Sequence, residues 1–291
     1  MAEYIWYGLG GVAYLFLAPL LGGILSGFDR KITARMQRRK GPPLLQPFYD
    51  FFKLWGKEPV AVNQAESFYV FGFFIFVVLT GLIFFARGDI LLVVFTLTMA
   101  SVCLIIAAYA VNSPYSQIGA ERELLQTMAY EPMLLLVALG FYLASGSFAV
   151  GDIMKTETMN ILRMPGIFVG LCFILLIKFR KSPFDLSMSH EAHQELVGGL
   201  KTEISGRTLA MVELAHWYEN VFLFGLVMLF FVSTSIWTTL LGFIVCEIVF
   251  FGGILVDVCC ARMKWERMLA LSWVFTLLSG FVNVAALMYF K

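Results

Sequence analysis

Ionisable side chains gather between two long apolar runs, in the segment from residue 179 to residue 206. This segment contains Pro183-Phe184-Asp185-Leu186 near its start and Glu203-Ile204-Ser205-Gly206 at its end. Because ionisable groups are costly beside lipid, such a cluster predicts a role in moving protons or ions. A solvated loop between two membrane spans would explain these charges alone. It would not explain the further ionisable groups inside the neighbouring apolar runs.

Two of the three histidines lie in this segment, His190 and His193, close to Glu191 and Glu195. Their spacing of three places both imidazoles on one helix face, as a metal site would need. The zinc-protease pattern, however, has histidines four residues apart, with Glu directly after the first. Histidine titrates near neutral pH. We therefore predict protonatable groups and no metal: the histidines belong to a coupling loop, and the glutamates to a proton or ion path.

Further ionisable residues lie inside two later apolar runs. Glu213, His216 and Glu219 are spaced by three residues and therefore share one helix face. Glu247 stands in the middle of the next run between apolar neighbours, and Asp257 lies near its end. A single buried Glu could simply be protonated and hydrogen-bonded to another helix. Several such groups in one chain favour a proton or ion path through them.

A third charged region leads into the fourth apolar run and includes Arg122 and Glu131. Pro132 follows Glu131 directly and removes a backbone donor, which frees the carbonyl of Met128 from its helical hydrogen bond. An interrupted helix here would give the carboxylate a hydrated position, as in transporters. Alternatively, the helix begins near Pro132 and Glu131 lies at its N-terminus. The sequence leaves both interpretations open.

The composition requires these groups to be positioned by membrane helices. Hydrophobic residues make up 60% of the 291 residues, charged residues 14%, and the mean hydropathy is +0.82. Runs of about 20 apolar residues are what a helix needs to cross the bilayer. We predict an all-α, polytopic membrane protein with a single integral membrane domain over 1–291 and no nucleic-acid partner. The eight predicted spans are 4–28, 68–86, 89–111, 126–146, 164–179, 208–232, 235–257 and 267–290.

The distribution of basic residues predicts the orientation of these spans in the cell membrane. Of the 21 Lys and Arg residues, only Arg87, Lys155, Arg163 and Lys291 fall on the side of the two termini. Loops rich in Lys and Arg stay in the cytoplasm, so both termini are predicted outside. The cytoplasmic loops 29–66, 112–125, 179–207 and 258–266 would form a docking and coupling face. The predicted docking residues are Arg30, Lys31, Arg35, Arg38, Arg39 and Lys40.

The first of these loops also contains an amphipathic helix. Leu45, Phe48, Phe51, Phe52 and Trp55 recur at helical spacing after the helix-breaking Gly41-Pro42-Pro43. Such a helix lies along the membrane surface or packs on a partner subunit. The five cysteines form no C-x-x-C pair, and iron–sulfur, zinc and nickel–iron centres need grouped thiolates. We therefore predict no cofactor in this chain itself.

Three multi-residue motifs, taken in order, cover nearly the whole chain. The first runs from Asp29-Arg30-Lys31 through Arg39-Lys40-Gly41-Pro42 and Leu44-Leu45-Gln46-Pro47 to Lys57-Glu58. The second comprises Gly119-Ala120, Arg122, Gln126, Tyr130 and Glu131, and the third Pro183-Phe184-Asp185-Leu186, Glu195-Leu196-Val197, Glu203, Ser205 and Gly206. Together they resemble the membrane subunit shared by respiratory complex I and the energy-converting membrane-bound [NiFe] hydrogenases.

Details of these motifs resemble the Ech-type hydrogenases of anaerobic bacteria and methanogens. Only Pro43 separates Lys-Gly-Pro from Leu-Leu-Gln-Pro, where the quinone-reducing relatives carry several more residues. The residues 131–135 and the His-containing residues 187–194 also resemble the hydrogenase branch. By this resemblance, the complex would oxidise ferredoxin, form H₂ and translocate protons or sodium ions. Its [NiFe] centre and iron–sulfur clusters would lie in partners: the hydrogenase large and small subunits and iron–sulfur subunits, beside an antiporter-like membrane subunit.

The resemblance also suggests roles for individual residues. It places Glu131, Glu195 and Glu203 on carboxylate positions of the family's acidic path, and Glu191 approximately so. Arg122 and Asp185 fall on charged motif positions, and His216 stands where the complex I branch has a carboxylate. Three alternatives remain: a quinone-chamber subunit of complex I type, a stand-alone proton or cation transporter, and a passive anchor with structural carboxylates.

Overall fold

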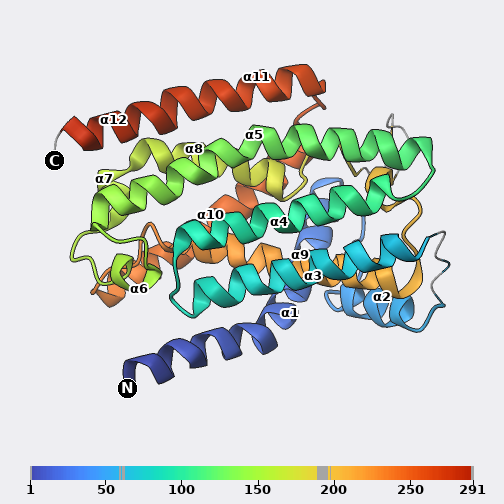
Figure 1. Ribbon diagram of the computed structural model, residues 1–291, viewed down its shortest axis with the longest axis horizontal. Helices are drawn as coiled ribbons and strands as arrows, with labels where there is room; N and C mark the ends of the chain where they lie inside the picture. The colour runs from blue at the N-terminus through green and yellow to red at the C-terminus, as the bar shows by residue number, and fades with distance from the viewer. Residues whose placement is uncertain (1, 59, 61–62, 189–195, 197, 290–291) are drawn as a thin grey trace.

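The computed structural model describes residues 2–58, 60, 63–188, 196 and 198–289. Over these residues the chain folds into helices and connecting loops, so it is an all-α polytopic membrane protein, as predicted (Figure 1). Six helical stretches are long and apolar enough to cross a membrane. They are α1 (Ala2–Met36), α3 (Gln64–Phe85), α4 (Ile90–Tyr109), α5 (Pro114–Ser145), α10 (Ile236–Cys259) and the run of α11 (Trp265–Phe275), a π-helical segment (Thr276–Phe281) and α12 (Val282–Tyr289).

The two remaining predicted spans correspond to α8 (Pro165–Lys178) and α9 (Gly206–Met228). α8 has 14 residues and is therefore about 21 Å long, which is less than a hydrocarbon core of about 30 Å. If α8 begins at one membrane surface, its last residue, Lys178, therefore does not reach the other surface and lies inside the membrane. α9 is long enough to span the membrane, but it contains Arg207, Glu213 and Glu219.

The structure of α5 shows that both interpretations of the sequence around Pro132, an interrupted helix and a helix start, are wrong. The helix runs without a break from Pro114 to Ser145 and includes Pro132 in its interior. It is therefore neither interrupted at Glu131 nor begun there. Tyr130 and Met133 on either side of Pro132 are buried against other helices, and such packing helps a membrane helix to tolerate a proline.

α9 occupies the centre of the bundle, where it contacts α1, α3 and α10. α3, α4 and α5 lie side by side, α1 lies at one edge, and α11 and α12 lie at the other beyond α5 and α8 (Figure 1). α1 begins and α12 ends at the same end of the bundle (Figure 1). The short helices α6 (Val150–Ile153) and α7 (Asn160–Arg163) lie between α5 and α8 in the chain, and a 3-10 turn (Gly199–Lys201) precedes α9.

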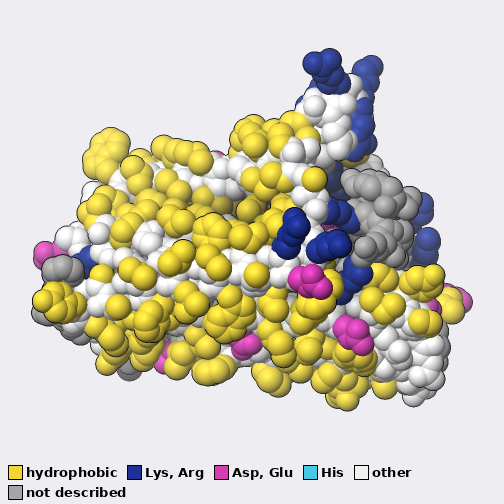
Figure 2. All heavy atoms as spheres, turned by 90° about the horizontal axis from the view of Figure 1, so that it is seen from above, with side chains coloured by type: hydrophobic (Ala, Val, Ile, Leu, Met, Phe, Trp, Pro, Cys, Tyr) yellow, Lys and Arg dark blue, Asp and Glu magenta, His cyan; other side chains and the backbone are white. Residues whose placement is uncertain are grey.

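The predicted amphipathic helix is α2 (Gln46–Trp55). Phe48 and Phe51 pack against Trp217 of α9, with ring centroids 5.2 and 5.7 Å apart. Phe52 and Trp55 are exposed. One face of this helix therefore packs on the chain's own α9. In the space-filling view, hydrophobic side chains cover most of the visible face, and Lys and Arg gather toward one end (Figure 2).

Candidate functional site

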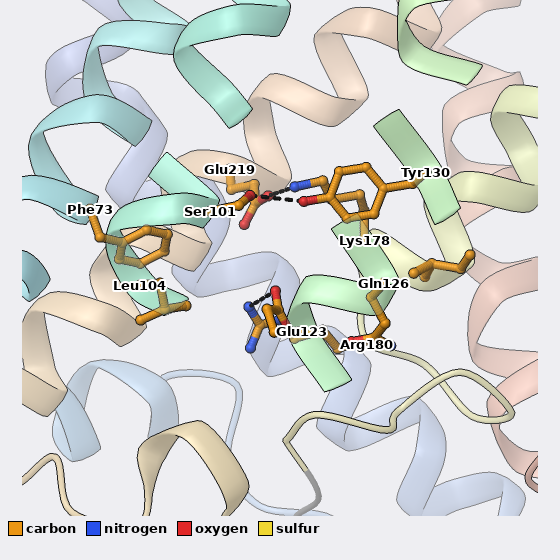
Figure 3. A pocket seen from close by; sticks show the side chains of 10 residues that line it. Phe73, Ser101, Leu104, Glu123, Gln126, Tyr130, Lys178, Arg180 and Glu219 are labelled. Carbon is orange, nitrogen blue, oxygen red and sulfur yellow. Dashed lines mark hydrogen bonds and ion pairs between the residues drawn. The ribbon is translucent and has the colours of Figure 1, made fainter. Parts of the chain in front are cut away.

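A buried polar cluster lies where α4, α5, α8 and α9 meet. The Lys178 ammonium at the end of α8 lies 3.0 Å from Oε1 of Glu219, and the two side chains are only 7% and 8% exposed. The same ammonium lies 4.2 Å from the centre of the Tyr130 ring. The Tyr130 hydroxyl shares a hydrogen bond of 2.8 Å with the hydroxyl of Ser101 (Figure 3). Four helices thus contribute one connected group of polar side chains.

The position of Tyr130 shows how deep this cluster lies. Tyr130 is near the middle of the 32-residue helix α5, about 24 Å of helix from either end. A buried ion pair is tolerated only when its geometry is good and further polar contacts support it. The Tyr130 ring face supplies such a contact to the Lys178 ammonium. Lys178 and Glu219 are therefore a charged pair held near the middle of the bundle.

A second polar group lies on the loop side of this pair. Arg180 donates to Oε1 of Glu123 at 3.3 Å, and the Ser187 hydroxyl donates to Oε2 of the same carboxylate. Gln126, one turn along α5 from Glu123, donates to the carbonyl of Phe184. Figure 3 shows Glu123, Gln126 and Arg180 of this group below the Lys178–Glu219 pair. A small cavity lined by both groups has room for roughly one water molecule.

His216 connects the buried pair with a much larger cavity. Its Nδ1 lies 3.4 Å from Oε2 of Glu219, and its Nε2 is buried with no hydrogen-bond partner among the described residues. His216 and Lys178 both line a cavity of about 970 Å³. One turn before His216, Glu213 pairs with Lys201 at 2.6 Å and lines the same cavity. The predicted stripe of Glu213, His216 and Glu219 thus leads from this cavity to the buried pair.

Ion pairs between the loop after α8 and the helices around it form the wall of the large cavity. Lys181 lies 2.6 Å from Asp29 of α1 and 3.3 Å from Asp257 of α10. Asp257 also accepts a hydrogen bond from the backbone of Ser182 at 2.8 Å. These contacts tie the start of the predicted coupling loop to two membrane helices.

Asp185 of the same loop has a side chain that is 11% exposed, and it lies 3.0 Å from Arg262. Burial raises the pKa of its carboxyl to about 6, although the Arg262 guanidinium acts in the opposite direction. Its second oxygen, Oδ1, is buried with no hydrogen-bond partner in the described structure. Arg122 of α5 donates to the carbonyl of Leu186, next to Asp185, at 3.4 Å. The second and third charged motifs of the sequence therefore meet here.

The other predicted path residues lie outside the central cluster. Glu131 is half-buried and accepts a hydrogen bond from Thr98 of α4 at 3.1 Å. Glu203 is half-buried near the buried Glu66 of α3. Glu247 is exposed and lines neither of the two polar cavities. The predicted residues His190, Glu191, His193 and Glu195 lie outside the described residues.

Most of the predicted docking residues are exposed. Arg30 pairs with Asp50 of α2 at 2.7 Å on the surface, and Lys31 is half-buried. The exposed members of the set beyond Arg30 are Arg35, Arg38, Arg39 and Lys40. Over the described ranges, no group of three or more His, Cys, Asp or Glu side chains is placed to hold a metal ion.

Lys178 and Glu123 were not predicted from the sequence as functional residues. Lys178 counted only as an orientation signal, since it follows an apolar run. Glu123 carried a detectable signal, because it precedes Gln126, Thr127 and Tyr130 at helical spacings of three, four and seven. That spacing predicts a continuous polar face, which the structure confirms through the hydrogen bonds from Gln126 and between Thr127 and Tyr130.

Known proteins resemble this chain over two thirds of its length or more. A family model described as NADH dehydrogenase matches residues 10–288. NADH-quinone oxidoreductase subunit 8 of Rhodothermus marinus is 28% identical, with 94% of each chain covered. Hydrogenase-4 component C of Escherichia coli (strain K12) is 30% identical, and the match covers 69% of this chain and 67% of that protein. NADH-ubiquinone oxidoreductase chain 1 of Xenopus laevis is also 30% identical, and the match covers 71% of this chain and 69% of that protein.

The fold matches that of a solved respiratory complex. A chain of the membrane-bound sulfane sulfur reductase, an archaeal respiratory membrane complex, superposes with a TM-score of 0.85 at 22% identity, covering 97% of this chain and 99% of the other. This match concerns the fold alone. The family model and the sequence relatives show more: the chain belongs to the NADH dehydrogenase family and is a membrane subunit of a respiratory oxidoreductase complex of complex I-like or hydrogenase-like type.

Proposed function

We propose that this chain is the ion-translocating membrane subunit of an Ech-type [NiFe] hydrogenase. The complex would couple ferredoxin oxidation and H₂ formation to the movement of protons or sodium ions. This chain would anchor the hydrogenase large and small subunits and the iron–sulfur subunits through its basic loops, beside an antiporter-like subunit. Both termini would lie outside the cell, and the loops 29–66, 112–125, 179–207 and 258–266 in the cytoplasm.

The observation that carries the ion-translocation part is the row of buried and half-buried ionisable groups. The row begins at Glu213 in the large cavity, passes His216 and reaches Glu219 and Lys178 inside the helix bundle. Groups of this kind inside a membrane protein are expensive and characteristically belong to proton or ion paths. A passive anchor has no need of charges at this depth.

The coupling loop is placed to act on this row. Arg180 and Ser187 of the loop hold Glu123, and Arg180 is two residues from Lys178 in the chain. We expect redox chemistry in the docked subunits to shift the loop. Breaking the contacts to Glu123 would change the electrostatic balance at Lys178 and Glu219, and a proton or cation would then move toward Glu131. Glu191 and Glu195 of the same loop remain candidates for this path.

The hydrogenase branch is favoured over the quinone branch by the walls of the large cavity. Its described lining includes Arg30, Arg39, Lys181, Asp185 and Arg262, among other charged groups. A quinone ring with an isoprenoid chain needs predominantly apolar walls, as small-molecule pockets generally have. The short first loop points the same way.

The second candidate is a quinone-chamber subunit of complex I type. Its support is the coverage of 94% with NADH-quinone oxidoreductase subunit 8 and a cavity volume of about 970 Å³, which is within the range of ligand sites. Nickel content separates the two candidates. The complex is isolated from membranes in mild detergent through a tag on this chain and analysed for metals. About one nickel per complex supports the hydrogenase, whereas flavin and iron–sulfur clusters without nickel support the quinone enzyme and overturn the proposal.

A further inference from the structure

A wide apolar groove runs along the bundle between α1 and α10, with α9 as its floor. Its volume is about 860 Å³. Leu21, Ile24 and Phe28 of α1 form one wall, and Phe243 and Phe251 of α10 form the other. These side chains are exposed in the chain. Unlike the cavity behind the coupling loop, this groove is almost entirely hydrocarbon.

Among the described residues that line it, two are charged: Arg87, just after α3, and Glu247 of α10. Glu247 lines the groove and is exposed. It lies near the middle of the 24-residue helix α10, with about 17 Å of helix on either side. Its neighbours along the helix surface, Phe243, Ile244, Ile248 and Phe251, are exposed hydrophobic residues. Within the described part of the chain, Glu247 makes no hydrogen bond or ion pair.

Such a position is unfavourable if only lipid covers it. A carboxylate at the bilayer centre is costly, and ionisable residues in spans normally face a protein interior or a partner charge. Acyl chains offer no hydrogen-bond donor. A neighbouring helix with a Lys, Arg or His side chain at the same depth offers both charge and donor.

We propose that the groove between α1 and α10 receives one face of a transmembrane helix from a partner subunit, and that a basic side chain of this helix pairs with Glu247. A ten-residue helical segment occupies on the order of 1,200 Å³ or more, so the groove takes the side chains of one face and leaves the rest of the helix outside. The inference does not depend on the hydrogenase assignment, because either kind of complex contains further membrane subunits.

The test is photo-cross-linking in the intact complex. A benzophenone amino acid is placed at Phe251, one turn from Glu247 in the groove, and the matched control at Leu278, which is 67% exposed on the C-terminal helical run at the opposite edge of the bundle. We expect irradiation of membranes to attach position 251 to one membrane subunit. The attached peptide should contain Lys, Arg or His within about one helical turn of the linked residue. The control position should not give this adduct.

The charge pairing is tested by combining the probe with substitutions of Glu247. Glu247→Leu suits a lipid-facing position and should leave the chain folded, but should lower the yield of the subunit adduct at least tenfold. Glu247→Gln keeps the shape and a hydrogen-bond acceptor and should lower it less. Adducts with lipid only, with a second copy of this chain, or with a helix lacking basic residues would each overturn the proposal. So would a yield that Glu247→Leu leaves unchanged.

Discussion

Lys178, the last residue of α8, forms an ion pair of 3.0 Å with Glu219 of α9, and both side chains are almost completely buried. This pair joins the shortest of the membrane helices to the central helix of the bundle. Removal of one member leaves the other charge buried without a partner, which lowers the free energy of unfolding by about 3–5 kcal/mol. Replacement of both removes the charge altogether. The pair therefore gives a direct test of how the buried cluster contributes to stability and to ion movement.

We expect Lys178→Met and Glu219→Gln each to lower the melting temperature of the purified complex markedly, because an unpaired charge remains. The double variant should recover most of that stability but should not recover ion translocation. The surface pair Arg30–Asp50, at 2.7 Å and about half exposed, is the control. Its loss should cost less than about 1 kcal/mol. Additive losses in the double variant would contradict the assignment of a coupled buried pair.

Substitution of Glu131 tests the predicted path on the α4 side of α5. Glu131→Gln preserves the size of the side chain and its contact with Thr98, but cannot ionise. The complex should assemble, while ion translocation in membrane vesicles should stop or become uncoupled from redox turnover. Thr98→Val, which removes only the hydrogen bond, is the matched comparison and should have a smaller effect. Fully coupled transport in Glu131→Gln would remove Glu131 from the path.

Substitution of Gly119 tests whether function requires the close contact between the coupling loop and α5. A Cβ atom at this position would lie 2.7 Å from the backbone nitrogen of Leu200 and 2.8 Å from the carbonyl carbon of Gly199. Gly119→Ala should displace the loop, with an overpacking cost of about 1–3 kcal/mol, and should weaken coupling more than assembly. Gly252 of α10 has open space at the same atom. Gly252→Ala should be neutral or slightly stabilising, and equal effects of the two variants would count against the loop contact.

Asp185 should make stability depend on pH in a defined window. Its folded pKa of about 6 lies above the unfolded value of about 3.9, so the folded state binds the proton more tightly. Stability should therefore fall as pH rises from about 4 to about 6, by at most roughly 3 kcal/mol. Melting curves of the complex across this range should show the slope in the wild type and a weaker slope in Asp185→Asn.

Arg262 provides the companion test, because its guanidinium lowers the pKa of Asp185. Arg262→Met should raise that pKa further and move the sensitive window to higher pH. An identical profile in all three proteins would show that Asp185 does not titrate as described.

The sequence predicted the membrane architecture and one helix face of the site, because both follow from local patterns. Apolar runs mark the spans, and the spacing of Glu213, His216 and Glu219 shows that they share a face. The sequence did not predict that α5 continues through Pro132, because packing against neighbouring helices outweighs the loss of one backbone hydrogen bond. The role of Lys178 depends on where the end of α8 meets Tyr130 and Glu219. No local sequence pattern predicts this contact between three helices.

Burial was likewise predicted only in part. Glu247 has the more apolar neighbours along the chain, but the structure buries Glu219 and exposes Glu247. The difference arises because α9 is enclosed by other helices on several sides, whereas α10 lies at the surface. Neighbours in space decide the environment of a side chain, and a single sequence does not show them.

The shortness of α8 has an electrical consequence. A polar cavity of about 970 Å³ reaches Lys178, and a polar cavity of this size holds water. Water conducts ions, so little of the transmembrane voltage drops across it, and most of the field falls across the remaining low-dielectric layer, about the 21 Å length of α8. An ion moving from the cavity mouth to the Lys178–Glu219 pair therefore does little electrical work. Beyond the pair, each charge carried across the layer costs or yields about 2.3 kcal/mol per 100 mV.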